Sequence, residues 1–351
     1  ANMTAVGYNA GLSHTTGNSS TFIGTDSGKL TTTGVGNTFV GDGSGRQNTT
    51  GASNVAVGQS ALLANTTASN NTAVGTSALT ANTTGDRNVA MGASALNANT
   101  TADGNTAVGY QALRDNTTAE ISTALGFEAL KQNTTGGSNT AVGTVALTAN
   151  TTGAANTAIG KGALLANTTG ATNTAVGESA LLINTTGSYH VALGRLAGQN
   201  ITTGDGNVCL GYNALASSAT VDNEFTLGST GITSLRCNDT SISALSDSRD
   251  KTNVIDSPYG LDFINTVRPV QFLWDTRDGN GKDGSTRIGF LAQELLAATD
   301  GNNAVLDLVM DDNPDKLEAK YGNLLPVAIQ AIKELSTQLD AALARITTLE
   351  G

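Results

Sequence analysis

The chain has 351 residues, of which 42 are glycine, 13% are charged and only 4% are aromatic. Globular proteins are on average about 25% charged, so this composition excludes one large conventional core and favours many thin, similar layers. The net charge of −11 argues against binding to a nucleic-acid backbone, which requires a basic face. We find no signal peptide and no apolar run of membrane-spanning length, and we expect no membrane insertion.

A glycine preceded by an aliphatic residue recurs every 17 positions, which gives thirteen repeats over residues 3–219. Each repeat is too short to bury a face alone, so neighbouring repeats must stack. No helical period of 3.6 appears, and the strict spacing is not typical of disorder. We therefore predict a mostly β fold, a parallel β-roll or solenoid. The glycines are Gly7, Gly24, Gly41, Gly58, Gly75, Gly92, Gly109, Gly126, Gly143, Gly160, Gly177, Gly194 and Gly211.

The repeat contains two apolar rows. One is the aliphatic residue before each glycine, such as Val74, and the other is the leucine four residues after it, such as Leu79. Side chains alternate along a strand, so Ala73 points to the opposite face from Val74. Only a small side chain fits there, which we interpret as close approach of another chain. We predict that Ala73→Leu disrupts trimers.

In four repeats a glycine replaces the second-row leucine. Two explanations stay open at this stage: these coils are narrower, or a neighbouring leucine fills the space. The glycines are Gly11, Gly28, Gly45 and Gly198, and the candidate leucines are Leu12, Leu30 and Leu196.

The recurring Asn-Thr-Thr-Gly segments predict turns, because Asn and Gly tolerate left-handed backbone. Stacked Asn side chains can form hydrogen-bonded ladders. Cys209 takes a small-residue position of the repeat and predicts a buried free thiol. His14 and His190 stand where other repeats have Asn, and no metal-binding pattern accompanies them.

The repeat core Asn-x-Ala-Val-Gly, as at residues 71–75 and 105–109, resembles the head repeats of trimeric autotransporter adhesins. It is also similar to repeats in tail fibres of marine phages. The resemblance covers about residues 1–219 and implies a left-handed parallel β-roll with three chains side by side.

The composition changes after the repeats. Residues 220–245 predict a connector of short strands, including 225–227, 232–237 and 242–245, and the more highly charged residues 246–351 predict a separate small α+β domain. From about residue 324 to 350 the apolar residues follow steps of three and four, which predicts a coiled-coil helix and hence an oligomer.

Several sequence blocks of this last domain resemble the endosialidase-type intramolecular chaperone, the S74 peptidase family. The blocks span essentially all of residues 246–351. They are Ser246-Asp247-Ser248-Arg249-Asp250-Lys251, Gly260-Leu261-Asp262-Phe263-Ile264-Asn265, Arg268-Pro269-Val270, Gly289-Phe290-Leu291-Ala292-Gln293-Glu294, Tyr321 and Leu325-Pro326-Val327.

This resemblance implies a trimerisation chaperone that cuts itself off after folding, by a serine–lysine reaction. Carried over to this chain, the nucleophile is Ser246, the base is Lys251, and the cut falls between Leu245 and Ser246. A serine needs a base to become a nucleophile, and a lysine acts as one only when it is neutral, which burial favours. Asp247, Arg249 and Asp250 would support the structure or orient the bond. We expect single-turnover autoproteolysis and no turnover of other substrates.

We expect no cofactor and no metal. The segment 278–284 is similar to part of a calcium loop, but Lys282 and Asp283 stand where an EF-hand needs an oxygen ligand and a glycine, so a hairpin loop is the better interpretation.

These observations predict a homotrimeric phage tail fibre for host attachment, made in the host cytoplasm and carried on the virion. We expect a cell-surface receptor, glycan or protein, contacted by variable turn residues, and other tail proteins bound through an N-terminal part that precedes this chain. The alternatives are a trimeric adhesin on a bacterial cell surface and a fragment of a glycan-degrading tailspike.

Overall fold

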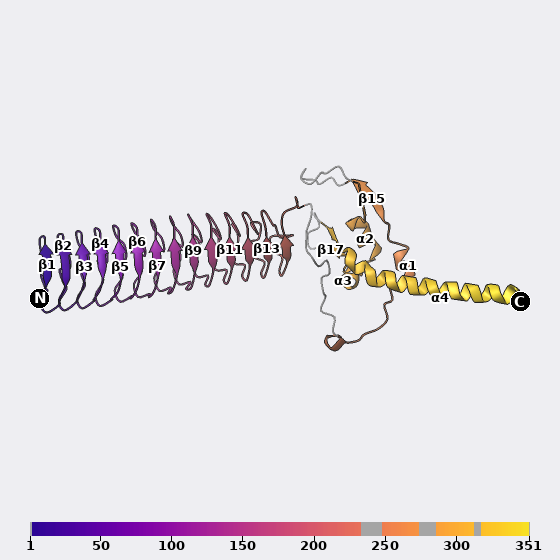
Figure 1. The fold of residues 1–351 in the computed structure, drawn as a ribbon, viewed down its shortest axis with the longest axis horizontal. Helices are drawn as coiled ribbons and strands as arrows, with labels where there is room; N and C mark the ends of the chain where they lie inside the picture. Colours follow the sequence, from indigo (N-terminus) through magenta and orange to yellow (C-terminus); the bar gives the residue numbers. More distant parts are fainter. Residues whose placement is uncertain (1, 233–247, 274–285, 312–316, 351) are drawn as a thin grey trace. The chain divides into compact units, whose positions relative to one another are not determined.

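The computed structural model describes residues 2–232, 248–273, 286–311 and 317–350 (Figure 1). Contacts within the chain divide it into two compact units, residues 1–229 and residues 230–351.

The first unit is a parallel β-solenoid with one short strand in each coil (Figure 1). Fourteen strands form one sheet in sequence order, and each residue pairs with the residue 17 positions later, as Thr72 pairs with Val89. The predicted parallel solenoid of 17-residue repeats is confirmed. The strands are β1 (Met3–Val6), β2 (Ser20–Ile23), β3 (Thr38–Val40), β4 (Val55–Val57), β5 (Thr72–Val74), β6 (Val89–Met91), β7 (Thr106–Val108), β8 (Thr123–Leu125), β9 (Thr140–Val142), β10 (Thr157–Ile159), β11 (Thr174–Val176), β12 (Val191–Leu193), β13 (Val208–Leu210) and β14 (Phe225–Leu227).

The interior of each coil is built from the alanine of the strand and the second-row leucine. Ala73 and Leu79 are both 0% exposed, whereas Val57 and Val6, in the row before the glycine, are 36% and 58% exposed. The aliphatic row does form a ladder, since Val57 pairs with Val74 and Val74 with Met91, but this ladder lies on the outer face. The predicted approach of another chain to Ala73 is therefore wrong, because Ala73 faces the interior of its own coil.

The replacement of leucine by glycine is explained by larger residues in the strand. Phe22 and Phe39 occupy the alanine position and are fully buried, and a side chain added at Gly28 or Gly45 would collide with their rings. Near Gly198 the space is taken by Leu181, Ile201 and Cys209, and not by the expected Leu196. Leu12 and Leu30 are exposed, so the interpretation that they fill the gap is wrong.

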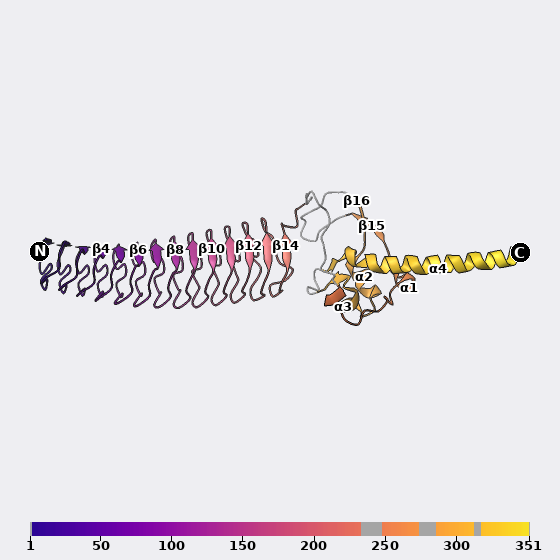
Figure 2. The ribbon, with the colours of Figure 1, turned by 60° about the horizontal axis from the view of Figure 1, so that its bottom comes forward.

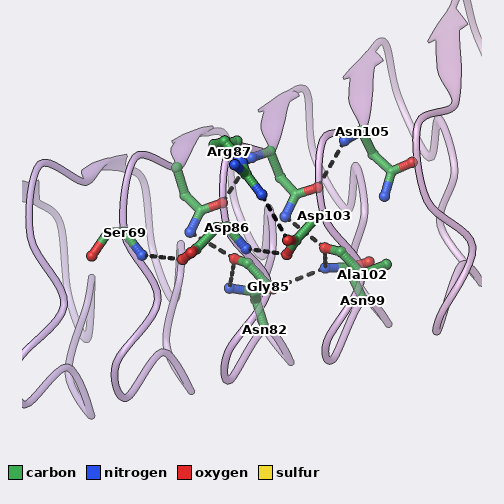
Figure 3. A network of polar contacts seen from close by, with 11 residues as sticks. Ser69, Asn82, Gly85, Asp86, Arg87, Asn99, Ala102, Asp103 and Asn105 are labelled. Carbon is green, nitrogen blue, oxygen red and sulfur yellow. Dashed lines mark hydrogen bonds and ion pairs between the residues drawn. The ribbon is translucent and has the colours of Figure 1, made fainter.

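The Asn-Thr-Thr segments are bends without left-handed backbone, whereas left-handed residues lie elsewhere in the coil, as Leu62 does in the turn after the corner glycine. The asparagines stack into buried ladders, as expected. The Asn99 amide donates to Asn82 Oδ1 at 2.8 Å and to the carbonyl of Ala102 at 3.1 Å, so one side chain both joins two coils and closes its own turn (Figure 3). A second row accepts backbone N–H groups, as Asn88 Oδ1 does from Asn105 at 2.9 Å. These bonds satisfy the polar groups that the coil buries. Figure 2 shows the strands on one side of the stack and the loops that close each coil.

The second unit contains two small antiparallel strand pairs and a long helix. β15 (Val270–Leu273) pairs with β16 (Thr286–Gly289), and β17 (Val309–Met310) pairs with β18 (Glu318–Ala319). The helical segments are η1 (Ser248–Asp250), α1 (Leu261–Ile264), α2 (Ala292–Ala298), α3 (Asn303–Leu306), η2 (Tyr321–Asn323) and α4 (Leu324–Glu350). The C-terminal helix is confirmed. Of the strands expected at 232–237 and 242–245 and the loop at 278–284, all residues but Ile232 lie outside the described part of the chain. The core consists of Leu295, Leu306, Leu308, Val309, Leu324 and Val327.

Candidate functional site

The second unit brings together sequence blocks that are far apart in the chain. Arg268, just before β15, donates from Nε to Glu294 Oε2 at 3.0 Å and from Nη2 to Oε1. These hydrogen bonds from Arg268 hold the pKa of the Glu294 carboxyl below its ordinary value. The pair is partly exposed, so it fixes the orientation of α2 against β15 more than it stabilises the fold.

A second junction joins the end of β16 to η2. The rings of Phe290 and Tyr321 meet edge to face with centroids 5.4 Å apart, and the Phe290 N–H donates to the Tyr321 hydroxyl at 3.3 Å. A side chain at Gly289 would lie 2.8 Å from that hydroxyl. A side chain at this position would therefore displace the Tyr321 hydroxyl.

A third junction ties α1 to α4. The Glu334 carboxylate accepts the N–H of Leu261 at 2.7 Å and the Gln330 amide at 2.9 Å, and the hydrogen bond from Leu261 lowers the pKa of Glu334. A side chain at Gly260 would collide with this carboxylate. Sequence reasoning missed Glu334, because nothing in the seam of α4 distinguishes it from the other solvated charges.

The predicted catalytic segment is described only in part. Leu245, Ser246 and Asp247, which include the expected nucleophile and both sides of the expected cut, lie outside the described residues. Within η1 the Lys251 N–H donates to the carbonyl of Ser248 at 3.3 Å, and the side chains of Arg249 and Lys251 are exposed. The side chain of Asp250 is outside the described set as well, so the Ser246–Lys251 pairing stays a prediction.

The outer face of the solenoid sheet is a second candidate site, for association with other chains. Because strand side chains alternate, Thr72 and Val74 point outward while Ala73 points inward. Repeated over the coils, this produces an outward ladder of aliphatic residues beside a ladder of Thr and Val. The most exposed members of the aliphatic ladder are Val6, Ile23, Val57, Met91, Leu125, Ile159, Leu193 and Leu227.

The acidic residues at the turns act as structural acceptors. Asp86 Oδ1 accepts the N–H of Ser69, and Asp103 Oδ1 accepts the N–H of Asp86, both at 2.7 Å, while Arg87 pairs with Asp103 at 2.9 Å (Figure 3). Glu178 pairs with Arg195 at 3.1 Å. These carboxylates are thus committed to bonds between coils. Cys209 is buried, as predicted, and desolvation raises the pKa of its thiol to about 11.

Within the described ranges, no three His, Cys, Asp or Glu side chains lie close enough to hold a metal ion. Among the helices that are described, none combines the length and apolarity needed to cross a membrane.

Comparison with known proteins gives a family match within the second unit. Residues 246–306 match the Peptidase S74 family, described as the chaperone of endosialidase. No curated protein and no solved structure matches the chain. The family match confirms the resemblance carried by the sequence blocks between residues 246 and 306, and the blocks at Tyr321 and Leu325-Pro326-Val327 lie beyond the matched residues. A chaperone of this kind following a β-solenoid fits a protein of the phage tail fibre or tailspike type.

Proposed function

We propose that this chain is the distal part of a homotrimeric phage tail fibre that attaches the virion to its host, and that its C-terminal unit is an intramolecular chaperone that cuts itself off between Leu245 and Ser246. The observation that carries this proposal is the chaperone match at residues 246–306 directly after a β-solenoid. The fibre's distal shaft would meet the cell-surface receptor, and segments before it would join other tail proteins.

Two exposed apolar surfaces support self-association. One is the outward aliphatic ladder of the sheet, and the other is the apolar stripe of α4, whose side chains are exposed. Exposed apolar patches of this extent mark interaction sites, and an apolar heptad stripe is covered by identical helices in a coiled coil. The exposed stripe residues are Ile332, Leu335, Leu339, Leu343, Ile346 and Leu349.

The proposed cleavage is an acyl shift followed by hydrolysis. Ser246 Oγ attacks the carbonyl carbon of Leu245 while Lys251 Nζ takes the hydroxyl proton, and that proton then passes to the departing amide nitrogen of Ser246. Water hydrolyses the resulting ester, which leaves a carboxylate on Leu245 and a free amine on Ser246. Lysine is a base only when neutral, and Lys251 is exposed in the single chain. Its burial on assembly would delay cutting until the trimer has formed.

The test is expression of residues 1–351, followed by denaturing electrophoresis, intact mass spectrometry and sedimentation. We expect two products divided before Ser246, with the larger one a trimer. Ser246→Ala and Lys251→Ala should stay uncut, whereas the control Ser248→Ala, an exposed serine of the same segment, should be cut like the parent.

An uncut parent would contradict self-cleavage, and a monomeric shaft would contradict the fibre. The tailspike alternative predicts turnover of polysaccharide. We expect none, because Asp86, Asp103 and Glu178 are occupied in bonds between coils. Release of reducing sugars from a host polysaccharide would reverse this conclusion.

A further inference from the structure

Two neighbouring coils carry exposed aromatic side chains that stack on each other. In the row directly after the corner glycine, Tyr110 and Phe127 follow each other, whereas the same row has Ala93 one coil before and Thr144 one coil after. The row also accepts Gln59, Lys161 and Glu178, so the folding of the coil does not require two adjacent aromatic rings. Tyr8 and Tyr212 stand in the same row, but neither has an aromatic residue at this position in a neighbouring coil.

The two rings form a ledge. Their centroids are 5.5 Å apart with an angle of 20° between the planes, yet Tyr110 is 47% and Phe127 49% exposed. Ala93 and Thr144 are too small to cover the remaining ring faces. The backbone beneath is held by the coil ladder, in which Glu128 donates its N–H to the carbonyl of Tyr110 at 2.9 Å.

A polar network begins at the edge of this ledge. The Gln111 amide donates to the Tyr110 hydroxyl at 3.2 Å, and Arg114 Nη1 donates to Gln111 Oε1 at 3.4 Å. Arg114 also makes two hydrogen bonds of 2.6 Å with the carboxylate of Asp115. The Arg114 side chain is about one third exposed, so the network presents partly solvated polar groups in an ordered arrangement.

Charge in the neighbourhood is balanced. Arg114 is paired with Asp115, and in the next coil Lys131 is paired with Glu128 at 2.7 Å. At the positions of Arg114 and Asp115 the preceding coil has the uncharged residues Asn97 and Ala98, whereas the following coil has Lys131 and Gln132. Two cations and two anions thus surround the aromatic pair, which gives no preference for a charged ligand.

We infer that Tyr110, Phe127 and the adjoining polar side chains form a binding site for a neutral glycan chain. The C–H bonds on the apolar face of a pyranose ring pack against the negative face of an aromatic ring, while its hydroxyl groups exchange hydrogen bonds with Gln111, Asp115 and Glu128. Such a site combines an apolar platform with a few placed polar groups.

A protein partner fits these observations less well. A stable protein interface covers about 800 Å² on each side, whereas the departure from the repeat is confined to two coils. The net charge of −11 also disfavours anionic polysaccharides and nucleic acids. As the receptor site of a fibre the inference rests on the proposed function, although the site itself lies within one chain.

The test measures retardation of the complete chain in native gels that contain dextran, mannan, arabinogalactan or β-glucan, with polygalacturonate as the anionic comparison. We expect retardation by at least one neutral polysaccharide. Tyr110→Ala/Phe127→Ala should weaken that binding about tenfold or more, as removal of aromatic anchors does elsewhere. The control Tyr8→Ala/Tyr212→Ala removes two exposed tyrosines of the same row and should bind like the parent.

Absence of binding to every neutral polysaccharide, stronger binding to polygalacturonate, or equal binding by both double variants would overturn the inference. Sedimentation of the same variants separates it from the alternative that another copy covers the ledge. A change of oligomeric state in Tyr110→Ala/Phe127→Ala would assign the rings to a contact between chains. Failure of the proposed function is distinct, because it would appear as a parent chain that neither trimerises nor is cut.

Discussion

At the residue scale, each residue of the shaft lies beside the residues 17 positions before and after it in the sequence. Asparagine suits the two buried polar rows because its side chain both accepts and donates hydrogen bonds, as Asn99 and Asn71 do. His190 breaks this rule. It is buried in an asparagine row, and its Nδ1 accepts the N–H of Asn207 at 3.1 Å.

His190 should make the shaft sensitive to acid. Desolvation lowers its pKa in the fold, against the opposing influence of Asp205 and Asp222. A pKa lower in the folded state means that the neutral ring is favoured there, so stability is complete above about pH 6.5, the value in the unfolded chain, and falls as the pH drops below it. We expect the melting temperature of His190→Asn to fall less than that of the parent when the pH is lowered from 7.5 to 5, as measured by circular dichroism. Parallel curves would contradict the prediction.

In the N-terminal coils, phenylalanine takes the place of the strand alanine, and glycine takes the place of the second-row leucine. Phe39→Ala should destabilise the N-terminal coils by about 3–5 kcal/mol, because it leaves a cavity. Adding Gly45→Leu should restore part of that loss, since most other coils combine alanine with a buried leucine at left-handed φ, such as Leu62 at 54°. Thermal unfolding of the single and double variants checks this. Gly45→Leu alone should be worse than the parent, because its side chain would collide with Phe39.

At the element scale, the strands are too short to stabilise a sheet individually, and each depends on the coils before and after it. The sheet has two apolar faces of different kinds. Its inner face is lined mostly by alanine and packs against leucine within one chain, while its outer face of valine, isoleucine and threonine has no partner among the described residues of the single chain.

The two faces should respond differently to substitution. Val74→Asp places a charge on the outer face, so we expect weaker self-association with an unchanged circular dichroism spectrum. Ala73→Leu instead overpacks the interior and should cost about 1–3 kcal/mol of stability, which corrects the expectation of a specific effect on trimers. Sedimentation velocity and thermal unfolding distinguish the two. Normal trimers in Val74→Asp would exclude the outer face as the interface.

At the scale of the whole molecule, the first unit is nearly one-dimensional, because each coil contacts only its neighbours. Its length is therefore adjustable in steps of one repeat. Strands β5 and β6, for example, pair with an offset of 17 residues, as the other neighbouring strands of this sheet do.

Deletion of residues 72–88 removes one complete coil and should leave a folded shaft with nearly the parent's melting temperature. Deletion of residues 72–79 removes about half a coil and should lower the melting temperature markedly, because the shortened coil cannot pair in register with the coils on either side of it. Circular dichroism melts of both deletions check this. Equal tolerance of the two would show that the ladders do not determine stability.

The sequence by itself determined the period, the parallel solenoid, the asparagine ladders, the C-terminal helix and the family resemblance of residues 246–306. These are local or strictly repeated features, so spacing and residue type suffice to recognise them. The serine–lysine pair also came from sequence blocks alone, and Ser246 lies outside the described residues.

Only the tertiary structure decided which face of the strand points inward. Alternation separates Ala73 from Val74, but both are apolar, and the inward direction depends on how the coil closes. Closure also decided that Phe22 and Phe39, not Leu12 and Leu30, fill the space above glycine. The contact of Glu334 with Leu261 likewise joins residues whose proximity no local pattern encodes. The space that a side chain fills and the direction in which it points depend on how the chain packs, which is why these assignments required the structure.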